Sequence, residues 1–509
     1  MSNTYVKYMN AISSDELYEG LLAYGLFTEK LPPIFTTKPF FDYCQKMTSS
    51  FANTPRQYIY HESIRNTNTP RGYGIPTPMA YQRLCRCIAD NWDNLKVHFS
   101  VHTAGQSHKV SRIHIRKFSV GSRLFKMNYN NWRTDGSPEP DLLIGNKYMV
   151  TADISNCFPS IYTHSLPWAL AGKDIAKANR HKSKWYNKID RYCQNCKHGE
   201  TQGLLIGPHS SNLLAEIILT VVDKKLYDTG WRYIRNIDDY CCYVSTLEDG
   251  QRFLSELREA LQFYNLALNH KKTEIKKLPV ASEEQWIRQI NSLHIIRSQK
   301  KRLDYKDVQA YLDSAIGLMK ENGMNSAILN YTIKTLSGKK FTANAREYYI
   351  KTVLHLAIVY PYLISIVEDC ILKHHDVEQA LLKKFVEAIF NDGSQVVHYE
   401  AICYAIYFAL KFDIELKNLE VQRVIDSQSC LYKVFAWIYF KERNDKKKLQ
   451  ALNTHAEVLS SCSEDFGANW LFVYEVLPES KLTNEWNAMK RAGISFIKSL
   501  DEIRASNTP

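Results

Sequence analysis

Two strand-like segments that end in acid constrain the fold of this chain more than any other feature. Residues 147–154 (KYMVTADI) predict a buried strand that ends in Asp153, and residues 231–244 predict two strands joined by a bend at 236–239. That bend carries Asp238 and Asp239. Carboxylates at the ends of apolar strands are costly unless a cation accompanies them, so these positions need a chemical explanation.

The elements around these acids predict an α+β layer. Apolar residues recur at helical spacing over 213–227 and 256–267, and a polar turn with a further strand follows at 268–278. Strand, helix, hairpin, helix and strand, in this order, indicate an antiparallel sheet with helices on one face.

The three acids are predicted to form one metal site. Asp153 and Asp238 are 85 residues apart in the chain (238 minus 153), and we expect both at one edge of the sheet. Three carboxylates together make a hard oxygen site for Mg²⁺. Two such ions can activate a hydroxyl nucleophile and stabilise a leaving pyrophosphate. An Asp-Asp pair alone is usually an ordinary turn, so the order of the surrounding elements carries this inference.

Four segments in that order resemble the palm motifs of reverse transcriptases. They are TADISNCFPSI (151–161), GLLIGPHSSNLLAEIIL (203–219), YIRNIDDYCCYV (233–244) and LALNHKKTEI (266–275). The resemblance covers residues 70–280, and four ordered motifs are more specific than any one of them. It implies fingers and a palm, followed here by a different C-terminal part.

The resemblance also implies catalytic roles. Asp153 and Asp238 would hold two Mg²⁺ ions, with Asp239 beside them as the third acid of the site. Lys272 would donate a proton to pyrophosphate, and Lys271 is its neighbouring alternative.

Further matches concern the nucleotide. Phe158 would lie under the sugar and clash with a 2′-hydroxyl, which implies dNTP substrates, although an ordinary core aromatic would fit the same pattern. Gly207 and Ser211 would support the nascent base pair. Two departures are Ile206, where many reverse transcriptases have Gln, and Ile237, where an aromatic residue or Ala is usual.

A basic segment precedes the palm motifs. Residues 109–133 contain seven Lys or Arg and no acid, and their partial alternation predicts strands. We select Arg112 and Arg116 as ligands of the incoming triphosphate, because guanidinium groups bind phosphate oxygens in pairs. A solvated basic edge strand is the alternative. The net charge of +12 also favours a polyanionic partner.

Three domains are predicted. Residues 1–70 form an N-terminal arm and helical region, in which Met1 to Asn10 are expected to be mobile, and residues 71–281 form the fingers and palm. Residues 72–98 are expected to contain one amphipathic helix after a Pro-rich start. Residues 282–509 form an all-helical domain of stacked hairpins, either HEAT-like or an irregular bundle.

Composition argues for an intracellular setting. Twelve Cys in 509 residues lack the density of a disulfide scaffold, and the pair Cys193 and Cys196 with His198 lacks a second ligand pair for zinc. The longest apolar stretch, 355–367, is interrupted by Pro361 and is too short to span a bilayer. With no apolar leader at the start, a cytoplasmic protein without membrane contact is expected.

Additional segments are similar to the abortive-infection reverse transcriptases of bacterial phage defence. They are YGLFTEKLPPIF (24–35), RGYGIPTPMAYQRL (71–84) and IADNW (88–92), together with the helical C-terminal half. This resemblance implies a ring-like trimer or hexamer and DNA synthesis without a template from a protein hydroxyl. The DNA product would then stay covalently attached to the protein.

Two other functions stay open at this point. One is an RNA-templated reverse transcriptase of the retron or intron kind, and the other is a nucleic-acid-binding scaffold with a relic palm. For priming we rank Tyr8 first and Tyr5 second, because both are expected on a flexible polar arm. Tyr24 ranks third, since its neighbours suggest a packed helix end.

Overall fold

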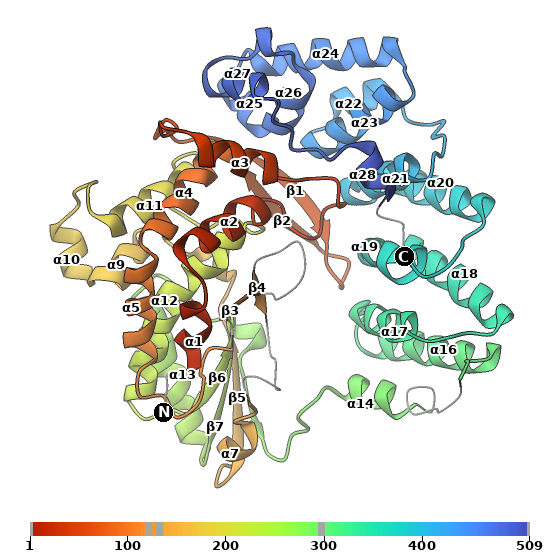
Figure 1. Ribbon diagram of the computed structural model, residues 1–509. Helices are drawn as coiled ribbons and strands as arrows, with labels where there is room; N and C mark the ends of the chain where they lie inside the picture. The colour runs from red at the N-terminus through yellow and green to blue at the C-terminus, as the bar shows by residue number, and fades with distance from the viewer. Residues whose placement is uncertain (1–3, 113, 118–124, 129–135, 294–300, 506–509) are drawn as a thin grey trace.

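A four-stranded antiparallel sheet forms the centre of the N-terminal half. The computed structural model describes residues 4–112, 114–117, 125–128, 136–293 and 301–505. The strand order is β6-β7-β5-β8, and Figure 1 shows the helices α12 and α13 beside the sheet. The strands are β5 (Tyr148–Asp153), β6 (Tyr233–Asn236), β7 (Asp239–Val244) and β8 (Glu274–Lys277).

Alternating burial explains how this sheet packs. Val150 and Ala152 of β5 are buried, and Gly250 of α13 lies close to Val150 and to Ile275 of β8. The helix α13 begins earlier than the sequence predicts, because the Thr246 hydroxyl caps it by accepting a hydrogen bond from the Asp249 amide. The helices of this region are α7 (Glu139–Leu143), α8 (Cys157–Ser160), α9 (Ser165–Ala171), α10 (Lys173–Ala178), α11 (Trp185–Asn195), α12 (His209–Asp228), α13 (Leu247–Gln262) and the 3₁₀ helix η1 (His270–Lys272).

The N-terminal elements surround the sheet and contain two further strand pairs. β1 pairs with β2, and β3 pairs with β4, each antiparallel. Their bounds, with those of the neighbouring helices, are α1 (Thr4–Asn10), α2 (Ser14–Tyr24), α3 (Lys38–Lys46), β1 (Tyr58–Ile64), β2 (Pro70–Pro76), α4 (Pro78–Asp90), α5 (Trp92–Thr103), β3 (His114–Lys117) and β4 (Phe125–Asn128).

Two expectations about this region are wrong. The first described residues form the packed helix α1 and not a mobile arm, because Tyr5, Val6 and Met9 share one buried face. Residues 72–98 contain the end of β2 and two helices in place of one. The helices α4 and α5 are separated at Asn91, whose side-chain amide donates to the Cys87 carbonyl.

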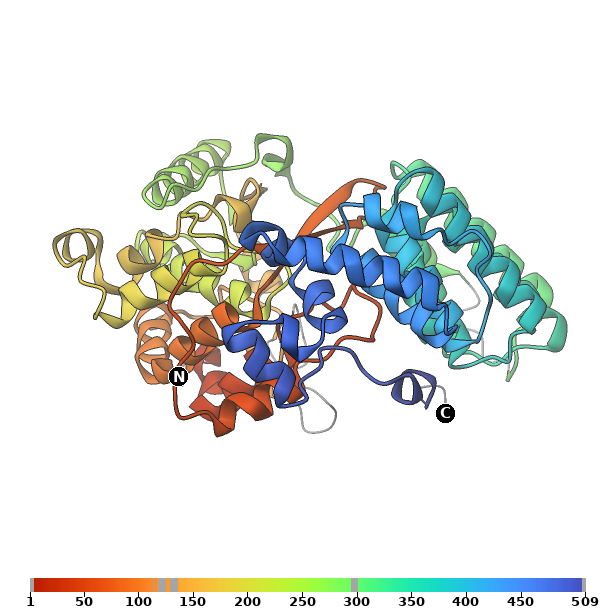
Figure 2. The same cartoon turned by 90° about the horizontal axis from the view of Figure 1, so that it is seen from above.

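The C-terminal half is helical, as expected. Figure 1 shows its helices as an arc from α14 at the bottom to α24 at the top. In the view from above, the cyan helices of this half lie at the right and the blue helices extend over the middle of the molecule (Figure 2). The bounds are α14 (Gln285–Ser292), α16 (Tyr305–Glu321), α17 (Ala327–Ser337), α18 (Ala343–Val359), η2 (Pro361–Leu363), α19 (Ile364–Val367), the π-helical η3 (Glu368–Leu372), α20 (Gln379–Gln395), α21 (Tyr399–Lys411), α22 (Val421–Asp426), α23 (Cys430–Glu442), α24 (Lys446–Ser460), α25 (Ser463–Ala468), α26 (Trp470–Val476), η4 (Glu479–Lys481), α27 (Asn484–Arg491) and α28 (Leu500–Ala505).

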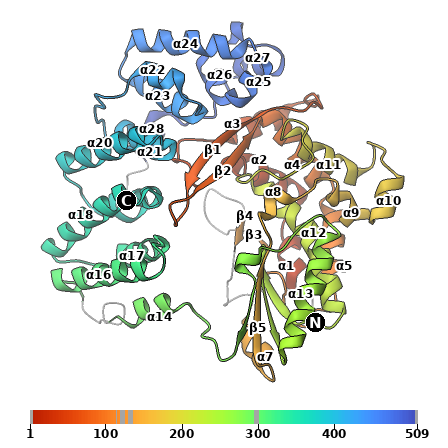
Figure 3. The ribbon, with the colours of Figure 1, turned by 180° about the vertical axis from the view of Figure 1, so that it is seen from behind.

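The arc packs back onto the N-terminal elements. The Thr36 amide donates to the Phe496 carbonyl, and the rings of Phe40 and Phe496 lie 5.7 Å apart. The β1–β2 hairpin extends from the sheet region to the helices α21 and α23 (Figure 3), where buried Glu400 accepts hydrogen bonds from the Ser63 hydroxyl and the Ile64 amide. Residues 1–70 therefore contact both halves, so their independence as a domain stays a prediction. Among the described residues, no helix combines the length and the apolar character needed to cross a membrane.

Candidate active site

The fold brings the three predicted carboxylates to one end of the sheet. Asp153 is the last residue of β5 and lies opposite Asp239, the first residue of β7. Asp238 belongs to the hairpin turn, and its carbonyl accepts a hydrogen bond from the Ile154 amide at 3.1 Å. Antiparallel pairing thus joins acids that are far apart in the chain.

Asp153 is enclosed and hydrogen-bonded. Its side chain is 7% exposed; the Asn269 amide donates to Oδ1 at 2.9 Å, and Lys272 Nζ lies 2.8 Å from Oδ2. The hydrogen bond to Asp153 raises the pKa of Lys272. Because the Lys272 side chain is 63% exposed, this cation can move away from Asp153 without unpacking the core.

The other two acids carry charge that is only partly compensated. Burial, followed by the nearby charge of Asp153, raises the pKa of Asp238. Burial, the charge of Asp238 and a hydrogen bond with Asp153 together raise the pKa of Asp239 to about 6. Three carboxyl groups therefore face one ammonium group, which is an arrangement that a further cation would stabilise.

The donor set fits Mg²⁺. Carboxylate oxygens are the hard ligands that this ion prefers, and bound Mg²⁺ would offset the burial and the mutual repulsion that raise the pKa values of Asp238 and Asp239. Within the described ranges, however, no three His, Cys, Asp or Glu side chains already converge on a common metal position. Lys272 is the cation beside Asp153 in this state.

A strained turn holds Asp238 in place. Ile237 has a φ of +56°, which is unfavourable for a β-branched residue. Arg235 Nη1 donates to the Ile237 carbonyl at 2.7 Å, and the Arg235 guanidinium is itself paired with Glu216 and Asp223. This buried cluster supplies the surrounding contacts that a strained residue needs in order to persist.

Sequence reasoning missed the Arg235–Glu216–Asp223 cluster. The signal was present, because Glu216 is a lone acid in the apolar run LLAEIIL of α12. A buried carboxylate in such a run requires a partner, and the chain provides it on the neighbouring strand β6. The partner itself could not be named without the tertiary contacts.

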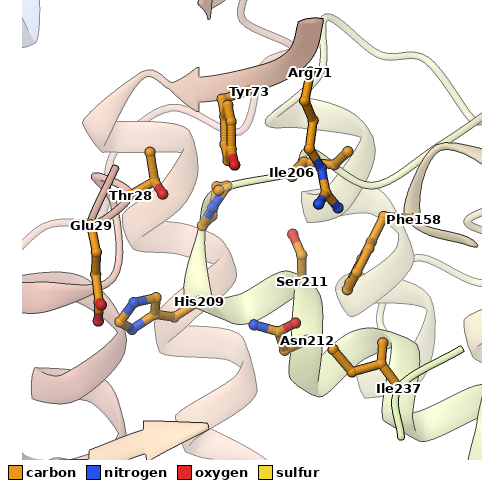
Figure 4. Close-up of a pocket in the computed structure, with 12 residues that line it drawn as sticks. Thr28, Glu29, Arg71, Tyr73, Phe158, Ile206, His209, Ser211, Asn212 and Ile237 are labelled. Atoms are coloured by element: carbon orange, nitrogen blue, oxygen red, sulfur yellow. The ribbon is translucent and has the colours of Figure 1, made fainter. Parts of the chain in front are cut away.

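A cavity of about 340 Å³ adjoins the acids (Figure 4). Ile237 lines it directly before Asp238, and the charge of Arg71 on β2 lowers the pKa of Asp238 against the larger effect of burial. Figure 4 shows Arg71 and Phe158 on one side of the cavity and His209 and Glu29 on the other. The site therefore has acids, a guanidinium and an aromatic wall within one region.

The predicted nucleotide-site residues Phe158, Gly207 and Ser211 all line this cavity. Gly207 has a φ of +124°, so a side chain would strain the backbone there. The Ser211 hydroxyl donates to the Leu205 carbonyl at 2.6 Å, so it shapes the loop before α12. Ile206 also lines the cavity, and its carbonyl accepts from the Gly74 amide of β2 at 2.9 Å.

The cation at the cavity is Arg71 and not Arg112. Arg112 is 1% exposed, and its Nη2 donates to the Gly136 carbonyl at 2.6 Å. Ser111 forms a bridge with Arg235, and the Arg112 amide donates to the Arg235 carbonyl at 2.8 Å, so this segment lies against β6. Arg116 belongs to β3, but its side chain lies outside the described residues. Arg71 was visible in the sequence only as the first residue of the RGYGIP segment.

The tyrosines ranked as primers are placed differently from the expectation. Tyr5 is 1% exposed, and its hydroxyl donates to Glu216 Oε1 at 3.0 Å. Tyr8 is half-buried on α1. Tyr24 is half-buried too, and it lines a small neighbouring cavity that shares Thr28 and Glu29 with the cavity described above. The premise of a free polar arm is therefore wrong.

The thiols of Cys193 and Cys196 are buried and unpaired by disulfide, which agrees with the sequence interpretation. Burial raises the pKa of both thiols. Neutral thiols are poor metal ligands, because binding requires the thiolate.

Comparison with known proteins identifies the domain that carries this site. Residues 110–311 match the family described as reverse transcriptase (RNA-dependent DNA polymerase). The chain therefore contains a reverse transcriptase domain, and the predicted α+β fold followed by a helical region is confirmed. No curated protein matches the chain.

Solved structures of telomerases show a distant likeness. Apo telomerase from Candida tropicalis truncated from its C-terminal domain aligns with 16% identity and a TM-score of 0.30, over 48% of this chain and 54% of that chain. The chain thus spans about half the length of that structure. Apo telomerase from the same organism aligns with 12% identity and a TM-score of 0.31, over 74% of this chain and 68% of that one. Telomerase from Candida albicans in complex with a fragment of telomeric RNA aligns with 10% identity and a TM-score of 0.29, over 71% of this chain and 69% of that one. At these TM-scores we draw no functional conclusion.

Proposed function

We propose that this chain is a DNA polymerase of reverse-transcriptase type that joins dNTPs into DNA. The observation that carries the proposal is the direct pairing of Asp153 with Asp239, next to Asp238, beside the cavity lined by Phe158 and Arg71. This arrangement supports the proposal, because a nucleotide and a metal ion would need acids, a cation and an aromatic side chain close together.

The carboxylates have distinct tasks in this proposal. Asp153 and Asp238 would hold two Mg²⁺ ions, and Asp239 would add negative charge beside them. When bound, these ions would activate the attacking hydroxyl and stabilise the leaving pyrophosphate. Lys272 would donate a proton to the pyrophosphate, and its exposed side chain leaves the ammonium group free to turn from Asp153 towards that group.

The cavity residues select the substrate. Arg71 binds the phosphates of the incoming nucleotide, and the Phe158 ring excludes a 2′-hydroxyl. Arg116, whose side chain is not described, is a second phosphate ligand in the proposal. Phe158→Ala should therefore admit ribonucleotides in a competition between dNTPs and rNTPs. An unchanged preference for dNTPs would make Phe158 a packing residue only.

We further propose that synthesis needs no template and begins on a tyrosine hydroxyl, in a phage-defence role. The segments 24–35 and 71–84 support this through their resemblance to abortive-infection enzymes. The same resemblance supports a ring-like trimer or hexamer and a HEAT-like C-terminal domain. The second candidate is RNA-templated synthesis, which the description of the matched family as RNA-dependent favours.

Tyr8 stays the first primer candidate, on the condition that α1 can detach. Tyr5 is less suitable, because its hydroxyl would first have to leave buried Glu216. Tyr24 gains support from its cavity next to the proposed nucleotide site. Mass spectrometry of protein purified with attached DNA identifies the tyrosine, and undiminished labelling of Tyr8→Phe would exclude Tyr8.

One experiment separates the candidate functions. Purified protein is incubated with Mg²⁺ and labelled dNTPs, with and without an added template and primer. Label that enters DNA without both supports untemplated synthesis, and label that requires an RNA template supports the second candidate. Asp228→Asn is a matched control, because Asp228 is an exposed acid whose ion pair, in the part of the chain that the structure describes, is with Lys224 on the same helix. A wild-type protein that incorporates nothing under either condition would contradict the polymerase proposal.

A further inference from the structure

A second cavity lies on the outer side of the reverse transcriptase domain. Its volume is about 390 Å³, and residues of α9, α10 and α11 and of their connections line it. These helices lie at the left edge of Figure 1, on the side away from the C-terminal arc. None of the roles proposed above uses this cavity.

Four cations line the cavity: Lys177, Arg180, Lys182 and Arg191. Lys177, Arg180 and Lys182 are exposed, and within the part of the chain that the structure describes none of the four forms an ion pair. Asn187 fixes the loop that carries two of them, because its side-chain amide donates to the Asn179 and His181 carbonyls at 2.7 and 2.9 Å. The cavity thus has a built, positively charged rim that its own acids do not neutralise.

Aromatic side chains line the same cavity, and Lys177 Nζ lies 5.9 Å from the centre of the Trp168 ring. The rings of Tyr162 and Trp168 lie 5.8 Å apart at an angle of 65°, and both residues are half-buried. Lys173 Nζ lies 4.2 Å from the centre of the Trp168 ring. Aromatic faces next to cations are the features with which proteins bind single-stranded nucleic acid, through base stacking and phosphate contacts.

A hydrogen-bonded histidine completes the site. His164 Nδ1 donates to Asp190 Oδ2 at 2.5 Å, and Gln194 Nε2 donates to Asp190 Oδ1 at 2.7 Å. These bonds fix the imidazole and direct its other nitrogen away from Asp190. The hydrogen bond to Asp190 also raises the pKa of His164, which favours a donor suited to an anionic ligand.

A short segment connects this cavity with the proposed active site. Phe158 lines the first cavity and Tyr162 lines the second, so their Cα atoms are at most roughly 14 Å apart. The segment is held by the loop that leads to Gly207, since the Leu204 amide donates to the Phe158 carbonyl and the Thr163 amide to the Thr201 carbonyl. A nucleic-acid strand that leaves the first cavity can therefore reach the second cavity within a few nucleotides.

We propose that the second cavity binds single-stranded DNA, the strand that the active site produces. Lys177, Arg180, Lys182 and Arg191 contact its phosphates, and Trp168 and Tyr162 stack on its bases. The identity of the strand as product depends on the proposed polymerase function, but the binding site itself does not.

The test measures binding of a labelled oligodeoxythymidine by the full chain over a range of salt concentrations. The double variant Lys177→Glu with Arg180→Glu should bind about tenfold more weakly or worse, because it loses two charge-assisted contacts. The slope of log affinity against log salt should fall by about 1.4, since each lost phosphate contact removes about 0.7 for a single strand. The matched control is Lys446→Glu with Lys447→Glu, an equal change of charge on exposed residues of α24. It should leave the slope unchanged.

Equal losses in the two double variants would overturn the proposal, because they would show a response to net charge only. Photocrosslinks from bromodeoxyuridine-containing DNA should map to Tyr162 or Trp168, and crosslinks that map only elsewhere would also overturn it. Tighter binding of oligouridine through the same side chains would overturn the assignment to DNA. Asp153→Asn should bind the oligonucleotide normally, so failure of the polymerase proposal would be seen in incorporation and failure of this one in binding.

Discussion

Two clusters of carboxylates lie on either side of the same hairpin turn, and they differ in how their charge is balanced. In the inner cluster, Glu216 and Asp223 are paired with the fully buried Arg235. In the outer cluster, Asp153, Asp238 and Asp239 share one exposed cation, Lys272. The inner cluster is complete without a ligand and shapes the turn, whereas the outer one leaves negative charge available to cations. The comparison teaches that balance of charge, and not the number of acids, separates a structural cluster from a candidate active site.

The largest expected effect comes from removing an acid of the outer cluster. Asp153→Asn or Asp238→Asn should lower incorporation of dNTPs by about a thousandfold or more, because metal ions contribute several kcal/mol of transition-state stabilisation. Thermal unfolding should be unchanged or slightly higher in temperature, since repulsion among the acids falls. The control is Asp228→Asn. Near-normal incorporation by either variant would remove these acids from the proposed mechanism.

A substitution in the inner cluster should lower the stability of the fold. Arg235→Met should lower the free energy of unfolding by about 3–5 kcal/mol, because it leaves Glu216 and Asp223 buried without their cation. Urea denaturation measures this loss. Arg252→Met is the matched control, because Arg252 is exposed and its contacts are an ion pair with Asp249 on the same helix and a cation–π contact with the Trp231 ring. Equal stability of the two variants would show that the inner cluster does not hold the turn.

Substitution of Lys272 tests whether the cation of the outer cluster takes part in catalysis. Lys272→Met should lower incorporation by about a hundredfold if its ammonium group acts as a general acid. The effect of Lys272→Met on the free energy of unfolding should stay below about 1 kcal/mol, since the Lys272 side chain of this ion pair is largely exposed to solvent. The neighbouring Lys271→Met is the control. A large loss of stability would instead place Lys272 with Arg235 as a structural cation.

The sequence predicted the outer cluster because its signals are local. Apolar strands that end in acid locate Asp153 and Asp238 within a few residues of the correct strand ends, and the hairpin bend requires only neighbouring residues. The cavity positions of Phe158 and Gly207 also follow from their local motifs.

The inner cluster and Arg71 could not be predicted, because their geometry depends on contacts between distant segments. Arg235 meets Glu216 only when β6 lies against α12, and Arg112 is buried only because residue 111 pairs beside Arg235. The same applies to α1: a seven-residue helix has little stability alone and forms here by packing. Polar residues in the first ten positions therefore suggested an arm where tertiary contacts produce a helix.

The pH dependence of stability should also distinguish the clusters. Burial and the neighbouring carboxylates raise the pKa of Asp239 to about 6 in the folded protein, from an ordinary value of 3.8. The protonated form is therefore favoured in the folded state, and its contribution is complete below pH 3.8 and lost as the pH rises through 6. In the presence of a chelator, we expect wild type to lose about 1 kcal/mol over this interval, the shift being discounted because Asp239 is partly solvated. Asp239→Asn should show a smaller loss, and added Mg²⁺ should restore stability to wild type only. A curve unaffected by Mg²⁺ would argue against metal binding.

The smallest expected effect concerns the tyrosine that reaches the inner cluster. Tyr5→Phe removes one hydrogen bond to Glu216, which still accepts from Arg235 and from the Ser111 hydroxyl. Because the acid keeps these partners, the loss of unfolding free energy should be only about 0.5–1.5 kcal/mol. Incorporation and covalent labelling should be normal, since a hydroxyl bound to the inner cluster is unsuited to start a strand. Tyr8→Phe, on the same helix, is the counterpart and should reduce labelling. Loss of labelling in Tyr5→Phe alone would connect the inner cluster with the chemistry and contradict the division between the two clusters.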